Sequence, residues 1–413
     1  MVFTLLCSFR TRSFLCLLER RYPILVYIVL LFFLFLLMET ARTSDSLSLS
    51  LYLSIYIYLS GFRDSTCVCM SIFDCFESVS NGFLALIKLE WKKGKGKPLV
   101  LQSRFRPNPM PPNIIRGVDG LPKVILTEPG GSSAEVLLFG GQVISWKNDR
   151  REELLFMSSK AILKPPNAIR GGIPICFPQF GNFGTLEQHG FARNRMWSID
   201  DCPSPLSPAN NQSSVDLILK STDEDLKTWP RSFQLRLRIS LGPGKLTLIP
   251  RVRNTDSRPF SFTFAIRNYL SVSDISEVRV EGLETLDYFD NLKQRQRFTE
   301  QTDAVTFDGE VDRIYLSTPS KIATIDHEKK RTFVLRKDGL PDAVVWNPWD
   351  KKAKALPDFG DEDYKVMLCV DSAAIENRIV LKPCEEWRGC QELSTVHSSY
   401  CSGQLDPWKV IHG

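Results

Sequence analysis

Apolar and polar residues alternate with a period of two along most of the chain from residue 123 onward. In the clearest stretch, 233–241, the apolar residues at every second position are separated by Gln, Arg, Arg and Ser. Gly-Pro-Gly follows at 242–244, and a second alternating run begins at Leu246. Successive side chains of a strand point to opposite faces, so this pattern predicts a β-hairpin over 233–249.

Similar short runs, bounded by Gly, Pro, Asn and Asp, recur without the helical segments that a parallel sheet would need between its strands. The sequence therefore predicts an all-β domain, residues 110–413, built as a large antiparallel β-sandwich. A sandwich of this size has a concave face, where polar residues could bind an extended or ring-shaped ligand. The runs are 124–127, 134–139, 143–146, 261–269, 278–280, 332–336, 343–346, 364–370 and 379–382.

The first 109 residues have a different character. Residues 22–38 form an uncharged apolar run preceded by four arginines, which is the pattern of a short membrane anchor with a cytoplasmic N-terminus. Residues 46–60 then alternate Ser with Leu and Tyr with Ile, which is what translated CT and TA dinucleotide repeats produce. Two interpretations stay open: a membrane anchor, or an upstream extension of the gene model with the working protein beginning near Met110.

Charge and cysteine usage exclude several classes of function. Residues 1–110 hold 13 Lys and Arg against 7 Asp and Glu, a net +6, whereas the rest holds 39 against 40, a net −1. A near-neutral main domain without a recognition motif argues against nucleic-acid binding. The 11 cysteines form no CxxC pair and the 4 histidines are scattered, so local spacing predicts no metal site. We expect reduced thiols and a cytoplasmic monomer, with membrane attachment only if 22–38 is an anchor.

Two neighbouring motifs carry the candidate chemistry, AIRGGIPICFPQFG at 168–181 and QHGFARN at 188–194. Arg170 and Arg193 offer planar, permanently charged forks that match phosphate oxygens, and the glycines beside Arg170 let backbone N–H groups approach closely. Either arginine alone would more simply form an ion pair on a sheet face. Together they indicate a site for a phosphorylated ligand.

These motifs resemble the hexose-6-phosphate mutarotases of the aldose 1-epimerase family, and the resemblance continues through EGL at 281–283, EVDRIY at 310–315 and WNPW at 346–349. It implies a galactose mutarotase-like fold and an isomerase that interconverts the α and β anomers of a hexose 6-phosphate without a metal or cofactor. It also implies that the substrate-binding positions are Arg170, Gln188, Arg193 and Asp312.

Other residues of these motifs have two interpretations. His189 either donates to sugar hydroxyls or is an ordinary loop histidine. Phe180, Trp346 and Trp349 are interpreted as core residues, because most aromatic side chains in a β-sandwich are buried there.

The chain departs from the family at both catalytic positions. The family uses a histidine as acid and a glutamate as base, whereas FAIRNY places Arg267 and MLCVD places Asp371 at these positions. Arginine stays protonated and cannot act as a general acid, although it can stabilise negative charge on oxygen. A carboxylate that is one methylene shorter moves by roughly 1 Å, which can lower a rate by about two orders of magnitude.

Three hypotheses about function stay open. The first is an active epimerase in which Asp371 is the base and Arg267 or a water molecule assists at the ring oxygen. The second is a phosphosugar-binding protein in which an Arg267–Asp371 ion pair has replaced the catalytic groups. The third is a membrane-tethered β-sandwich interaction module, which depends on residues 22–38 being an anchor.

Overall fold

The computed structural model describes residues 114–117, 120–201, 203 and 212–397, together with the backbone of five short strands before residue 110. The chain divides into two units, Met1–Pro109 and Met110–Gly413. In the first unit, β1 (Val68–Cys69) pairs with β4 (Lys92–Lys93), and β2 (Phe76–Glu77), β3 (Phe83–Ala85) and β5 (Arg106–Pro107) form a small sheet. The proposed anchor, 22–38, lies outside the described residues.

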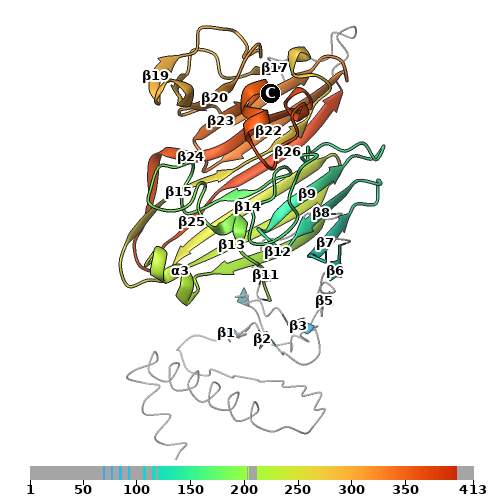
Figure 1. Cartoon of the computed structure of the whole chain (residues 1–413). Helices are drawn as coiled ribbons and strands as arrows, with labels where there is room; N and C mark the ends of the chain where they lie inside the picture. Colours follow the sequence, from blue (N-terminus) through green and yellow to red (C-terminus); the bar gives the residue numbers. More distant parts are fainter. Residues whose placement is uncertain are drawn as a thin grey trace, which may run out of the picture. The chain divides into compact units, whose positions relative to one another are not determined.

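The second unit is built from antiparallel sheets, which confirms the predicted fold class (Figure 1). Its eight-stranded sheet contains β10 (Ile175–Cys176), β15 (Phe260–Ile266), β16 (Tyr269–Ser271), β18 (Asp287–Asp290), β19 (Gln296–Thr299), β20 (Val311–Tyr315), β23 (Asp342–Asn347) and β24 (Met367–Leu381). The strand order is β10-β15-β24-β23-β20-β18-β19, and β16 also pairs with β24.

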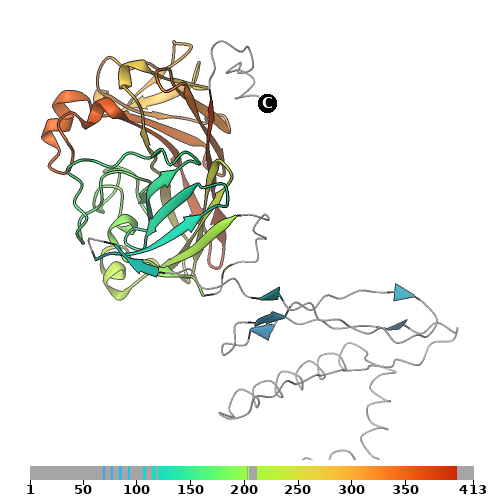
Figure 2. The same ribbon diagram turned by 90° about the vertical axis from the view of Figure 1, so that its right-hand side faces the viewer.

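A nine-stranded sheet packs against it, in the order β11-β12-β13-β14-β26-β22-β21-β17 with β25 paired to β14. The view in Figure 2 shows the strands of this unit layered over one another. The bounds are β11 (Ser198–Ile199), β12 (Ser213–Lys220), β13 (Phe233–Gly242), β14 (Lys245–Asn254), β17 (Val278–Glu281), β21 (Lys321–Asp326), β22 (Arg331–Asp338), β25 (Glu386–Arg388) and β26 (Cys390–His397).

The remaining elements are a four-stranded sheet and short helices. The sheet consists of β6 (Ile114–Arg116), β7 (Pro122–Thr127), β8 (Ser133–Leu137) and β9 (Gln142–Lys147) in that order. None of the helices in the described part of the chain combines the length and hydropathy that a bilayer crossing requires. They are α3 (Asp223–Thr228), α4 (Trp349–Ala355) and four 3-10 turns, η1 (Ala192–Asn194), η2 (Ile275–Glu277), η3 (Asn291–Lys293) and η4 (Asp363–Val366).

The predicted hairpin is confirmed, because β13 and β14 pair with Leu241 opposite Leu246. The prediction was wrong near the C-terminus, where two strands, 364–370 and 379–382, were expected. Residues 364–366 belong to the η4 turn, and the rest of both runs up to Leu381 lies in one strand, β24. The pairing of β24 with β15 shifts register between Phe262 and Phe264, which marks a bulge. The exposed polar residues 377–378 at this bulge interrupt the apolar period, so one strand looked like two.

Aromatic rings fill the space between the two large sheets. Phe177, directly after β10, is fully buried and its ring lies 5.0 Å from that of Phe233 on β13 and 5.3 Å from that of Phe262 on β15. Phe264 on β15 lies 5.0 Å from Trp387 on β25. Ring contacts between the sheets exclude water from a core that no single sheet could bury by itself.

The opposite face of the eight-stranded sheet carries polar groups. On β24, Leu368 and Val370 join the main core, whereas Cys369 and Asp371 point to the other face. Trp346 on β23 lies on that second face and its ring contacts Arg267, which follows β15. The alternation of the strands therefore separates a packing face from a face that can hold a site.

The aromatic junction between the sheets gives a stability prediction. We expect Phe177→Ala to lower the free energy of unfolding by about 3–5 kcal/mol, because it removes a fully buried ring and leaves a cavity. Phe183→Ala is the matched control, since Phe183 is 36% exposed and should cost less than about 1 kcal/mol. Urea denaturation measures both values, and equal losses would show that Phe177 does not hold the sheets together.

Candidate active site

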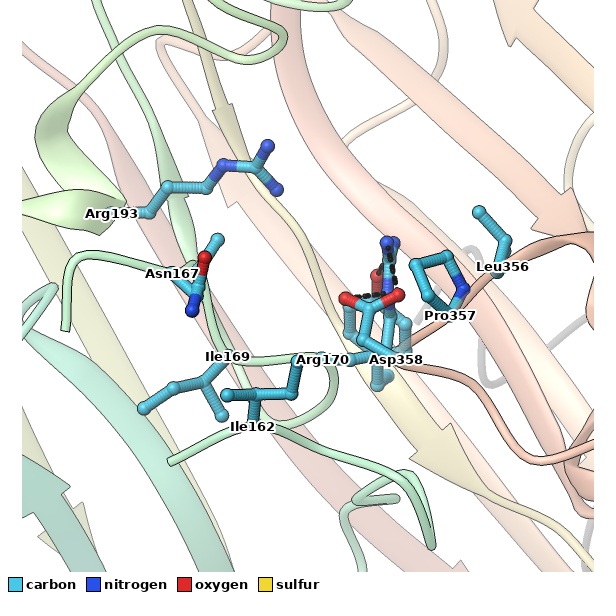
Figure 3. A pocket seen from close by; sticks show the side chains of 10 residues that line it. Ile162, Asn167, Ile169, Arg170, Arg193, Leu356, Pro357 and Asp358 are labelled. Carbon is cyan, nitrogen blue, oxygen red and sulfur yellow. Dashed lines mark hydrogen bonds and ion pairs between the residues drawn. The ribbon is translucent and has the colours of Figure 1, made fainter. Parts of the chain in front are cut away.

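A cavity of about 260 Å³ opens beside the polar face of the eight-stranded sheet (Figure 3). Ile162, Ala168, Ile169, Leu356 and Pro357 form its apolar wall. Its polar lining residues are Asn167, Arg170, Arg193, Tyr269 and Asp358. A mixed lining with two guanidinium groups suits a small polar anion that also presents carbon atoms.

Arg170 is held in a fork-to-fork ion pair with Asp358. Its Nε lies 3.1 Å from Oδ2 and its Nη2 lies 3.0 Å from Oδ1, while Nη1 donates to the Tyr269 hydroxyl at 3.3 Å. Burial works to lower the pKa of Arg170, but Tyr269 and Asp358 outweigh it and the pKa lies above its ordinary value. The charge of Arg170 is thus largely balanced by that of Asp358.

Arg193, on η1, is the other cation of the cavity. Its Nη2 donates to the backbone oxygen of Gln188 at 2.7 Å, and its buried Nε has no hydrogen-bond partner. Among residues 114–117, 120–201, 203 and 212–397, no carboxylate lies within ion-pair distance of Arg193. Burial lowers the pKa of this guanidinium, as expected for a cation removed from water. Arg193 therefore supplies positive charge that an anionic ligand can neutralise.

Arg267 lies deeper, on the polar face of the sheet. Its guanidinium stacks 4.4 Å from the ring centre of Trp346 and 5.3 Å from that of Tyr269. Its Nε and Nη2 are buried without hydrogen-bond partners. Burial opposes its charge, but the nearby Tyr269, Cys369 and Asp371 hold the pKa well above the ordinary value.

Asp371 is fully buried beside Arg267. Its Oδ1 accepts a hydrogen bond from the backbone N–H of Asn268 at 2.9 Å, and its Oδ2 has no hydrogen-bond partner. Oδ2 lies 3.9 Å from the Nε of Arg267, which is too far for a hydrogen bond. Burial raises the pKa of Asp371 to about 7, although Arg267 and the Asn268 N–H oppose the shift.

The pair is therefore not a closed salt bridge. Buried polar atoms without partners are uncommon, and each costs about 1–3 kcal/mol. Here three of them, Nε and Nη2 of Arg267 and Oδ2 of Asp371, lie together on one face of the sheet. They can donate to and accept from the hydroxyl groups of a ligand.

His189 completes this buried group. Only 6% of it is exposed, its ring packs edge-on against Phe180 at 4.8 Å, and its Nε2 lies 3.3 Å from the Nη1 of Arg267. Its Nδ1 accepts from the backbone N–H of Gly181 at 3.1 Å. Burial and then the positive charges of Arg267, Arg193 and Arg170 lower the pKa of His189 well below its ordinary value.

The structure brings most of the predicted residues together in two adjoining groups. Arg170 and Arg193 line the cavity, whereas Arg267, Asp371 and His189 form the buried group. Tyr269 joins them, because its hydroxyl contacts Arg170 and its ring contacts Arg267.

Of the two remaining predicted residues, Asp312 lies near the buried group and Gln188 lies outside both groups. Asp312, on β20, accepts from the side chain of Asn291 at 2.7 Å and interacts electrostatically with Arg267, and burial raises its pKa. Gln188 has an exposed side chain that does not line the cavity, although its backbone oxygen holds Arg193.

The sequence analysis did not identify Tyr269 or Asp358 as site residues. It also did not predict the contact between Trp346 and Arg267. Tyr269 is two residues after Arg267, so the period of a strand could have placed both on one face. Trp346 is buried as predicted, yet its ring also contacts Arg267. Nothing in the sequence distinguishes Asp358 from Asp361 and Asp363 in the same acidic loop.

Comparison with known proteins identifies the family. The model of the aldose 1-epimerase family matches residues 122–394. A "Putative glucose-6-phosphate 1-epimerase" of Cenchrus ciliaris is 66% identical over 305 residues, which are 73% of this chain and 92% of that protein. One with the same name from Escherichia coli is 31% identical over 273 residues, 65% of this chain and 88% of that one.

A solved structure agrees with the sequence matches. The crystal structure of a "putative mutarotase" from Salmonella typhimurium has a TM-score of 0.62 and 26% identity, covering 69% of this chain and 97% of its own. The fold and the site thus define a β-sandwich sugar isomerase. The chain belongs to the aldose 1-epimerase family, and its predicted activity, the interconversion of sugar anomers, is confirmed. The non-catalytic alternative is not favoured.

The buried carboxyl group gives a prediction about stability and pH. Because the pKa of Asp371 is about 7 in the folded protein and about 3.9 when unfolded, the folded state holds this proton more tightly. Its contribution to stability is therefore present at low pH and is lost as the pH rises from about 4 to 7.

Asp371→Asn removes this titration. Between pH 5 and 8, the free energy of unfolding of the native protein should fall by about 2–3 kcal/mol relative to that of the variant. Denaturant unfolding of both proteins at several pH values measures the difference. A difference that does not change with pH would show that Asp371 is ionised throughout this range.

Proposed function

We propose that the protein interconverts the α and β anomers of glucose 6-phosphate or a closely related hexose 6-phosphate. The observation that carries this proposal is Arg193, a cation without a carboxylate partner in the described part of the chain, in a cavity next to the buried Arg267–Asp371 pair. A phosphate supplies the missing negative charge, and the sugar ring then extends toward the pair. The relatives named as glucose-6-phosphate 1-epimerases support the same substrate class.

Arg170 and Arg193 contribute unequally to the proposed binding of phosphate. Two nitrogens of Arg170, Nε and Nη2, already contact Asp358, so Arg170 contributes mainly through Nη1, beside the hydroxyl of Tyr269. Arg193 has one nitrogen on the Gln188 carbonyl and the rest of its fork available. We therefore assign most of the phosphate affinity to Arg193 and the orientation of the bound group to Arg170 and Tyr269.

Asp371 acts as the general base at the anomeric hydroxyl in this proposal. A base works best when its pKa lies near the working pH, and burial places that of Asp371 at about 7. When Asp371 takes the O1 proton, a C1–O1 double bond forms and the bond between C1 and the ring oxygen breaks. Rotation about the C1–C2 bond and reclosure with return of the proton then yield the other anomer.

Arg267 stabilises negative charge and transfers no proton. Its guanidinium remains charged and lies over the ring of Trp346 in a buried site, where fixed donors are most effective. An ion pair that merely filled the catalytic positions would close to hydrogen-bond distance. The 3.9 Å separation instead leaves both groups available to a substrate oxygen.

We further propose that residues 110–413 are the catalytic unit and that the protein works as a cytoplasmic monomer on a hexose phosphate. The described cysteines, Cys176, Cys369, Cys384 and Cys390, are all free thiols, which supports a reducing compartment. The family match begins at residue 122 and supports the boundary near 110. Whether residues 1–109 contain an anchor or a gene-model extension stays a prediction.

Anomer exchange measured by magnetisation-transfer NMR tests the base. Glucose 6-phosphate should exchange faster with the protein than without it, and Asp371→Asn should lower kcat by about 100- to 10,000-fold, because the variant cannot accept the O1 proton. Asp223→Asn makes the same chemical change at an exposed position on α3 and should leave the rate unchanged. Full activity of Asp371→Asn would assign the base elsewhere.

The role of Arg193 predicts a change in substrate affinity. Arg193→Gln should raise KM for glucose 6-phosphate about 10- to 100-fold with little change in kcat, because it removes a charge-assisted contact to phosphate. Any exchange of unphosphorylated glucose should be unaffected. Arg258→Gln, at an exposed arginine, is the control. An unchanged KM in Arg193→Gln would place the phosphate elsewhere.

A further inference from the structure

The cavity holds a negative charge beside its two positive ones. The charged side chains among its described lining residues are Arg170, Arg193 and Asp358. Asp358 accepts from Arg170 through both oxygens, at 3.1 and 3.0 Å, whereas Arg193 donates to a backbone oxygen. Two guanidinium charges and one carboxylate charge leave this lining with a net charge of +1.

The fold fixes the place of Asp358 in the loop that follows α4. The next residue, Phe359, is fully buried, and its ring lies 6.2 Å from that of Trp346 on the polar face of the sheet. Further along the same loop, the carboxylate of Asp363 accepts from the backbone N–H of Ser159 at 2.8 Å. These contacts hold the loop in place, so the carboxylate of Asp358 stays beside the cavity when a ligand enters.

Asp358 lowers the electrostatic potential in the cavity. The Nε and Nη2 of Arg170 donate to it and Nη1 donates to Tyr269, so an anion that meets Arg170 also lies near this carboxylate. The Coulomb energy of a ligand is proportional to its charge and to the local potential. With Asp358 in place, a second negative charge on the ligand therefore adds less affinity than it would beside two uncompensated guanidinium groups.

A sulfate ester is the ligand that isolates this effect. Sulfate and phosphate esters both present three terminal oxygens in a tetrahedral arrangement. Near neutral pH, however, a sulfate ester carries a single negative charge, whereas a phosphate monoester carries about 1.5 to 2 negative charges. The net charge of the lining is neutralised by a single negative charge, so its balance of charges suits a sulfate ester as well as a phosphate ester.

We propose that Asp358 determines the charge of the anion that the cavity accepts, and that the cavity binds hexose 6-sulfates as well as hexose 6-phosphates. This inference rests on the proposed function and adds a second class of ligand to the same cavity. Asp358 acts here as a specificity-determining residue, because it offsets the charge of Arg170 without touching the anomeric centre.

The charges of the neighbouring buried group do not distinguish the two esters. This group contains the cation Arg267 and the carboxyl groups of Asp371 and Asp312. Burial and the nearby arginines lower the pKa of His189, which keeps that ring neutral. In the proposed binding mode these groups face the sugar ring, which is the same in both esters, so a difference in affinity between the esters reports on the cavity.

Isothermal titration calorimetry of the full chain with glucose 6-phosphate and glucose 6-sulfate, near neutral pH, tests this inference. In the native protein we expect the two dissociation constants to agree within about 10-fold. In Asp358→Asn the ratio should widen by about a further 10-fold in favour of phosphate, because the more highly charged ligand gains more from the freed charge of Arg170. Partial loss of folded protein in a variant affects both ligands equally and cancels in the ratio.

Two further variants separate the charge of Asp358 from its shape and from the total charge of the protein. Asp358→Glu keeps the carboxylate and should keep the native ratio within about 3-fold. Asp361→Asn is the matched control, since it removes the same charge from an exposed position on the same loop, where Asp361 pairs with Lys160 at 2.6 Å. The ratio in this control should equal that of the native protein.

The outcomes separate this inference from the proposed function. A native preference for phosphate above about 100-fold, an unchanged ratio in Asp358→Asn, or an equal change in Asp358→Glu or Asp361→Asn would overturn the role of Asp358 and leave the epimerase in place. Expected binding ratios without faster anomer exchange of glucose 6-phosphate would overturn the proposed function alone. A native protein that binds neither ester would overturn both.

Discussion

The arrangement of the site depends on the distance kept between Arg267 and Asp371. Opposite charges in a low dielectric attract strongly, so a buried pair that does not close must be held apart. On one side, the guanidinium packs against the rings of Trp346 and Tyr269. On the other, the backbone N–H of Asn268 holds one oxygen of the carboxylate. The fold thus keeps two charged groups partly unsatisfied, which favours the binding of a ligand between them.

That separation is supported from the far side of the sheet. The side chains of Asn268 and Gln391 are fully buried and exchange hydrogen bonds of 3.0 and 2.7 Å. Gln391 lies on β26 of the nine-stranded sheet, and Asn268 also donates to the backbone oxygen of Val370 at 2.8 Å. The polar contact between the sheets therefore sets the position of the strand segment that carries Asp371. Asn268 therefore contacts both parts of the structure. Its side chain joins the two sheets, and its backbone N–H holds Asp371.

The sequence predicted the fold class and much of the site because both leave local signals. Period-two alternation identifies strands, and the ordered motifs contain Arg170, His189, Arg193, Arg267 and Asp371. Contacts between distant segments leave no such signal. Arg170 and Asp358 are 188 residues apart, and their pairing depends on the topology of the whole domain.

The absence of a local signal also explains why the positions of some side chains were not predicted. Gln188 matches a family motif, but the turn that places His189 inside leaves the side chain of Gln188 outside. The open geometry of Arg267 and Asp371 could not be read from residue types, because those types equally describe a closed ion pair. The open geometry depends on the rings of Trp346 and Tyr269 beside Arg267 and on the backbone N–H that binds Asp371.

The two departures from the family pattern are consistent with one coordinated change. By resemblance, a histidine and a glutamate occupy the positions of Arg267 and Asp371. Arginine is longer than histidine and aspartate is shorter than glutamate, so the cation extends further from its backbone while the carboxylate lies closer to its own. The histidine of the family is lost, but a permanent charge is gained, and the Nη1 of Arg267 lies 3.3 Å from the Nε2 of His189. In the proposed mechanism, the charge of Arg267 stabilises the ring oxygen as the ring opens, and only the proton of the anomeric hydroxyl needs an acceptor on the protein.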